Sequence, residues 1–105
     1  MTELDRLEQY LHDSGYKYKR IDNPIPPSMI EVREKYNLPV GWCEQHQLIV
    51  YDINGRRLWD AICQWGSYGY SQGLIEIMGE LVQNKHDRVE GWLTAQDIIN
   101  RLEAR

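Results

Sequence analysis

The spacing of apolar and polar residues predicts four helices. Residues 2–14 carry three leucines at helical spacing, with charged side chains on the opposite side. A short helix is expected over 28–36, and another over 74–82, where apolar residues cover more than half of the helix surface. The last helix begins at Thr94, because Asp97 three residues later completes a capping box.

Between these helices, alternation with a period of two predicts a β-hairpin. Residues 46–53 and 57–64 flank the dipeptide Asn54-Gly55, which is typical of a two-residue type I′ turn. A two-residue turn fixes which side chains face each other across the hairpin. The predicted pairs are Ile53 with Arg56, Asp52 with Arg57, Tyr51 with Leu58, Val50 with Trp59, Ile49 with Asp60, Leu48 with Ala61, Gln47 with Ile62, and His46 with Cys63.

Together these elements predict one α+β domain over residues 1–105. Its small antiparallel sheet would consist of the central hairpin and a short edge strand at 16–21, packed with about four helices. Residues 83–91 are expected to form a polar connection. Neither face of the hairpin is polar along its whole length, so one face should pack on helices. The other is then covered as well, or is an exposed patch that binds something.

Composition and charge narrow the possible partners. The chain has 4 Trp and 7 Tyr but no Phe, so every large ring carries a polar atom that needs a partner or water. The net charge of −4 disfavours unspecific nucleic-acid binding and favours a protein partner. No apolar run suggests a secretory leader or a membrane span, so we expect a cytoplasmic protein. No motif calls for a cofactor or a metal.

The stretch "QWGSYGYSQG", residues 64–73, combines three glycines with three aromatic rings. Rings and glycines on one loop are typical of a recognition surface. A tight corner that leads into the predicted helix, with Ser71 as its cap, explains the same residues, as does a loop whose amides hold an anion. The candidate binding residues are Trp65, Ser67, Tyr68, Tyr70 and Ser71, with Trp59 and Arg57 nearby.

A reactive pair is the chemical alternative. The predicted register places Cys63 opposite His46, close enough for a nucleophile and its base, although Asp60 lies on the opposite face and cannot orient the imidazole. A metal site of Cys43, His46 and Cys63 matches no strong zinc spacing. A disulfide between Cys43 and Cys63 is disfavoured, because a regular ladder would hold them about 10 Å apart.

Two segments, "WDAICQWGSYG" and "GWLTAQDI", carry a family resemblance. They resemble a group of small bacterial and prophage-type proteins with a WDAIC-x-x-GSYG core and a GWLTA-x-D-I C-terminal helix. This resemblance implies a phage-derived product that modulates or inhibits a host system, such as a defence nuclease, and it carries over no catalytic residue. We therefore expect a non-enzymatic protein that binds another macromolecule. A small-ligand or nucleotide-binding protein, or a thiol enzyme, remains the alternative.

Overall fold

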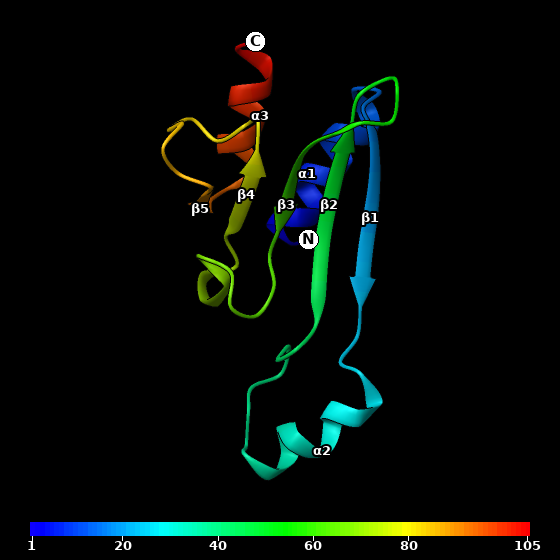
Figure 1. Ribbon diagram of the computed structural model, residues 1–105, viewed down its shortest axis with the longest axis vertical. Coiled ribbons are helices and arrows are strands. Elements are labelled where there is room, and N and C mark those ends of the chain that lie inside the picture. Colours follow the sequence, from blue (N-terminus) through cyan, green and yellow to red (C-terminus); the bar gives the residue numbers. More distant parts are fainter.

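The computed structural model describes all 105 residues and has an α+β fold built around one sheet (Figure 1). Five antiparallel strands follow one another in the order β1-β2-β3-β4-β5, and the sheet is accompanied by three helices. The elements are α1 (Glu3–Asp13), β1 (Lys17–Asn23), α2 (Pro27–Lys35), β2 (Gln45–Tyr51), β3 (Arg57–Ile62), the 3-10 turn η1 (Tyr70–Gln72), β4 (Ile75–Gly79), β5 (Val89–Leu93) and α3 (Ala95–Glu103). The predicted fold class is confirmed, although the sheet is larger and the helices are fewer than expected.

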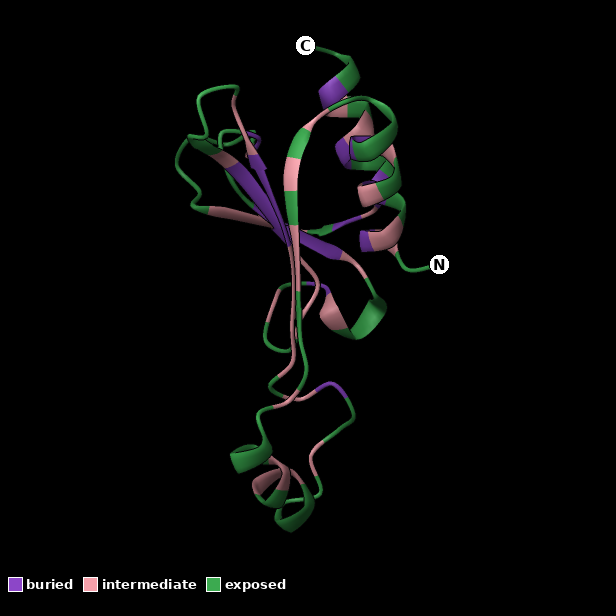
Figure 2. Ribbon diagram, turned by 90° about the vertical axis from the view of Figure 1, so that its right-hand side faces the viewer, coloured by how far each residue is buried: buried purple, intermediate pink, exposed green.

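Helices α1 and α3 lie on the same side of the sheet (Figure 2). Both begin with the predicted capping boxes, in which a threonine hydroxyl and an aspartate carboxylate each accept a backbone N–H. The N–H of Ala95 donates to the Glu3 carboxylate at 3.1 Å and joins the two helices at their N-terminal ends. The core between helices and sheet contains Leu4, Leu7, Leu11, Leu48, Val50, Trp59, Ala61, Ile75, Ile77, Ile98 and Leu102. All three helices are too short and too polar to span a lipid bilayer.

The hairpin of β2 and β3 has the predicted register along most of its length. The four pairs from Gln47–Ile62 to Val50–Trp59 are those expected. The turn itself differs, because only Gly55 has a positive φ, and the N–H of Asp52 donates to the carbonyl of Arg56. The loop therefore has three residues, a type I turn followed by a left-handed glycine. The predicted pairs nearest the turn were wrong.

A bulge in β3 restores the register beyond the turn. Tyr51 pairs with Arg57, but its neighbour Val50 pairs with Trp59, so Leu58 is the extra residue. A three-residue loop shifts the pairing by one step, and the bulge shifts it back. The side chains of the hairpin's central part consequently face as predicted. The face with Trp59 packs on the helices, whereas the opposite face carries no helix.

The predicted helix at 74–82 was wrong. Residues Ile75–Gly79 form strand β4, which lies between β3 and β5. Gly79 has φ +107°, and a Cβ there would lie 2.6 Å from the carbonyl oxygen of Leu58, so β3 passes directly against it. The close approach expected at Gly79 is therefore present, but on a strand. The segment expected as a polar connection contains the start of β5.

Residues 24–44 form an arm between β1 and β2. The arm contains α2, close to the short helix expected at 28–36, and extends away from the sheet along the 48 Å long axis of the molecule (Figures 1 and 2). No residue of α2 is buried, and within the arm only Gly41 is. The arm adds nothing to the core, which lies entirely between the sheet and the two terminal helices.

Candidate functional site

The glycine-rich stretch connects β3 to β4, so it joins two strands and does not lead into a helix. Ser71 lies within the short turn η1 and caps no helix. The anion-binding interpretation combined the loop's amides with those of a following helix, and strand β4 stands in place of that helix. The glycines do serve a tight corner, since Gly66, Gly69 and Gly73 all have positive φ.

This loop is fixed on strand β5. The N–H of Trp92 donates to the carbonyl of Tyr68 at 3.3 Å, and the N–H of Tyr68 donates to the buried carboxylate of Glu76 at 3.0 Å. A Cβ on Gly91 would lie 2.3 Å from the Cβ of Tyr68, and one on Gly69 would lie 3.1 Å from the backbone of Trp92. Two glycines from separate segments thus allow loop and strand to touch, and the backbone of Tyr68 is held from both sides.

Four aromatic rings gather where the loop meets β5. Tyr68 stacks on Trp92, with ring centroids 5.2 Å apart and planes inclined by 21°, and Trp65 meets Tyr70 edge to face at 5.9 Å. Trp65, Tyr68 and Trp92 remain 45%, 52% and 57% exposed. Together the four rings line a groove of about 370 Å³, completed by Gly66, Ser67, Gly69 and Ser71. We call this the aromatic groove.

The structure brings together five of the seven predicted binding residues. Those five, which line the aromatic groove, are Trp65, Ser67, Tyr68, Tyr70 and Ser71. The other two lie elsewhere, since Trp59 is a core residue with 2% exposure and Arg57 is near the hairpin turn, 3.3 Å from Asp60. Ser67 has a structural task, because its hydroxyl donates to the carbonyl of Gln64 and accepts the N–H of the same residue.

Trp92 is the groove residue that sequence reasoning missed. It is one of three non-glycine residues with positive φ, at +55°, a conformation that bulky side chains avoid. Backbone strain of this kind is concentrated at functional sites. The only local sequence signal for a special backbone conformation here is the dipeptide Gly91-Trp92. The ring lies beside the loop because β5 pairs with β4, and no local sequence pattern predicts that pairing.

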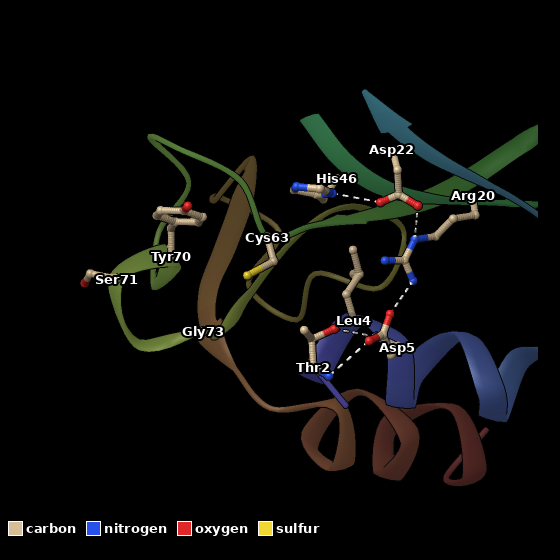
Figure 3. A pocket seen from close by; sticks show the side chains of 10 residues that line it. All are labelled: Thr2, Leu4, Asp5, Arg20, Asp22, His46, Cys63, Tyr70, Ser71 and Gly73. Carbon is tan, nitrogen blue, oxygen red and sulfur yellow. Dashed lines mark hydrogen bonds and ion pairs between the residues drawn. The ribbon is translucent and has the colours of Figure 1, made fainter. Parts of the chain in front are cut away.

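A second cavity of about 630 Å³ lies between α1, the strands β1 and β2, and the far side of the loop (Figure 3). Arg20 is central to it. The guanidinium contacts Asp22 at 3.0 Å, and Asp5 and Glu8 at 3.1 Å each. Three carboxylates therefore share one cation. The predicted candidates His46, Cys63, Tyr70 and Ser71 also line this cavity.

His46 bridges two carboxylates. Its Nδ1 lies 2.8 Å from Asp22 and its Nε2 lies 3.1 Å from Glu44. The hydrogen bond to Asp22, followed by that to Glu44 and opposed by partial burial, raises the pKa of His46 above its usual 6.5. Burial opposes the low pKa of Asp22, but the hydrogen bonds from His46 and Arg20 prevail and lower it.

This geometry does not assemble the alternative reactive pair. Cys63 faces His46 across the hairpin as predicted, since its N–H donates to the carbonyl of His46 at 3.2 Å. Both ring nitrogens of His46 are engaged by carboxylates, however, and burial raises the pKa of the Cys63 thiol. The thiol is thus kept protonated and has no free base. Both cysteines are free, and no three His, Cys, Asp or Glu side chains converge as a metal site.

Comparison of the chain with models of protein families, with curated proteins and with solved structures gave no match. The function is therefore argued from the geometry of the aromatic groove and of the cavity at Arg20.

Proposed function

We propose that this protein acts by binding another protein through the aromatic groove, without chemistry of its own. The observation that carries the proposal is the display of Trp65, Tyr68 and Trp92, each about half exposed, on a backbone that is held in place. Tyrosine and tryptophan supply a disproportionate share of the energy of protein interfaces. Three such rings on one surface form a natural anchor for a partner.

The rigidity of the groove supports this function. A loop that is already ordered loses little conformational entropy when a partner binds, so more of the contact energy remains as affinity. Tyr68 uses both its N–H and its carbonyl within the fold, and Gly69 and Gly91 let the loop pack directly against β5. The rings are therefore presented in one geometry before the partner arrives.

The charges favour a protein partner over nucleic acid. No Lys or Arg lines the aromatic groove, and the chain has a net charge of −4, so the groove cannot neutralise phosphates. A cytoplasmic host protein, such as a nuclease of a defence system, fits the role that the family resemblance implies.

Capture of the partner by matched variants tests the proposal. The immobilised wild-type chain is compared with a variant carrying Trp65→Ala and Tyr68→Leu, using cell extract from the native host. Tyr70 stays intact, because its hydroxyl lies where a Cβ of Gly41 would be and so supports the arm. We expect the double variant to lose at least 90% of the captured partner, since loss of two anchors weakens binding by roughly 100-fold or more.

A matched control in the second cavity separates the two surfaces. Cys63→Ser changes a side chain that lines the second cavity but not the aromatic groove, and it should leave capture unchanged. Equal capture by wild type and double variant, with both chains folded by circular dichroism, would refute binding through the groove.

The cavity around Arg20 favours a second candidate function, the binding of a small molecule. Its volume of about 630 Å³ lies within the range of ligand pockets. The local charge is negative, because one guanidinium is shared by three carboxylates, those of Asp5, Glu8 and Asp22. This charge disfavours the binding of anions such as nucleotides. Thermal stabilisation by small amines but not by phosphates would support this candidate, and no stabilisation by either would remove it.

A further inference from the structure

We infer that the aromatic groove binds a proline-rich segment of the partner in the polyproline II conformation. This inference rests on the proposed function and specifies the partner's chemistry. The groove is lined entirely by uncharged residues, namely Trp65, Gly66, Ser67, Tyr68, Gly69, Tyr70, Ser71 and Trp92. A charged segment would lose its hydration there without gaining a counter-ion, so the matching ligand is uncharged and presents apolar faces to the rings.

The hydrogen-bonding groups of the groove further restrict which uncharged ligands can bind. Four carbonyl oxygens of the loop accept backbone N–H groups within the fold, those of Ser67, Tyr68, Gly69 and Tyr70. What remains at the exposed rings is the two indole N–H groups and the Tyr68 hydroxyl. An indole N–H can only donate. The exposed tryptophans therefore offer two donors, and a matching ligand presents carbonyl acceptors to them.

A proline-rich segment presents such carbonyl acceptors. Each proline contributes a carbonyl acceptor but no N–H donor, and its ring gives a flat apolar surface that packs on tryptophan and tyrosine. The polyproline II helix is largely formed before binding, so little entropy is lost. One turn of three residues spans about 9 Å. Aromatic-lined grooves are a recurrent way of recognising such segments.

An oligosaccharide is the uncharged alternative that also stacks on aromatic rings. Its hydroxyl groups donate as well as accept, so a bound sugar needs acceptors from the protein. Ser67 is already committed to Gln64, and the four loop carbonyls are committed to the fold. These commitments leave fewer acceptors for sugar hydroxyls, whereas the indole N–H groups match the carbonyls of a proline-rich segment.

Isothermal titration calorimetry with a capped octaproline tests the inference. The probes for comparison are a capped Gly-Ser octapeptide and cellohexaose, titrated into the full chain. We expect saturable binding of octaproline only, with an affinity that changes less than twofold between about 50 and 300 mM salt, because no charge pair contributes. Trp92→Gly should weaken it at least about tenfold. Trp42→Phe, which changes a tryptophan of the arm outside the groove, should leave it unchanged.

Tyr68→Leu serves as the second variant, so the test stands even where Trp92→Gly alters the fold. It should also weaken octaproline binding at least about tenfold. Equal binding of the Gly-Ser peptide, or binding of cellohexaose in place of octaproline, overturns the inference. Failure of octaproline to bind, while aromatic-dependent partner capture persists, overturns this inference and leaves the proposed function standing. Loss of aromatic-dependent capture while octaproline binds refutes the proposed function alone.

Discussion

Gly91→Ala tests how the aromatic groove is built. Gly91 lies in β5, and a Cβ there would sit 2.3 Å from the Cβ of Tyr68 and 2.9 Å from its carbonyl oxygen. Carbon atoms in contact lie about 3.5–4.0 Å apart, so Tyr68 must move by more than about 1 Å. Such a movement separates the stacked rings and stretches the hydrogen bond from the Trp92 N–H.

The expected loss follows from these two contacts. Overpacking costs about 1–3 kcal/mol, and a weakened hydrogen bond adds at most about 1 kcal/mol. Because Tyr68 lies on the surface and can partly relax, we expect a total of about 2 kcal/mol for Gly91→Ala. For a domain of this size, that lowers the melting temperature by about 8–16 °C. Thermal unfolding followed by circular dichroism measures this loss, and the near-ultraviolet spectrum reports the stack.

Gly73→Ala is the matched control. Gly73 belongs to the same loop and has φ +71°, but nothing lies within 4 Å of its Cβ position, so the substitution strains the backbone without a collision. It should cost about 1 kcal/mol and preserve the near-ultraviolet spectrum. If Gly91→Ala melts within 2 °C of the wild type and keeps its aromatic signal, Tyr68 does not rest on Gly91, and the geometry derived for the groove is wrong.

Three further predictions concern the second cavity and the sheet. Because the pKa of His46 is raised in the folded chain, its ion pairs stabilise the fold fully below about pH 6.5, and this stabilisation is lost as the pH rises through the folded pKa. His46→Asn should therefore lower the free energy of unfolding by about 1 kcal/mol at pH 6 and by almost nothing well above the folded pKa, as measured by urea titration. Cys43, which is exposed, should react with iodoacetamide at neutral pH well before Cys63, whose thiol pKa is raised by burial; peptide mass mapping shows the order, and faster labelling of Cys63 contradicts it. Gly79→Ala should lower the free energy of unfolding by more than about 3 kcal/mol, because the added Cβ collides with backbone atoms of β3 and the residue keeps a positive φ. A fully folded variant with an unchanged melting temperature would contradict the β3–β4 pairing.

Local signals determined what could be predicted of the fold. The caps at Thr2 and Thr94 are short sequence patterns with one physical meaning, and both helices begin there. Asn54-Gly55 located the hairpin, although the sequence did not show that a loop one residue longer would be compensated by a bulge at Leu58. Where the deciding interaction lies within a few residues, the sequence is sufficient.

Strand β4 shows where local signals fail. Residues 74–82 place apolar side chains so densely that helical and alternating patterns both fit. Ile75 and Ile77 face the core, whereas Met78 on the other face is 48% exposed, as expected for a strand. The choice depends on β5, an edge strand of mixed polarity that carries no strong strand signal of its own. Because residues 74–82 were predicted to be a helix, the pairing partner of β5 was missing and β5 was not predicted either.

The candidate site likewise combines features that local sequence predicts with features that depend on distant strand pairing. The loop's glycines and rings were visible in composition, and they do lie together. Trp92 joins them only through the pairing of β4 with β5, and Asp22 reaches His46 only because β1 pairs with β2 across the arm of residues 24–44. Contacts between segments so far apart depend on topology, which no single stretch of the chain specifies.

Stability gives little reason for a tryptophan at position 92. A left-handed backbone costs a residue other than glycine about 1–2 kcal/mol, and the stack on Tyr68 returns about 0.5–1.5 kcal/mol. The ring stays 57% exposed, so burial within the chain adds only part of what a tryptophan can supply. The stack and the strain largely offset each other, so the folded chain gains less from this side chain than from a buried tryptophan. The exposed part of the Trp92 ring is apolar surface that a bound partner would cover, and the proposed binding role would account for a tryptophan at this strained position.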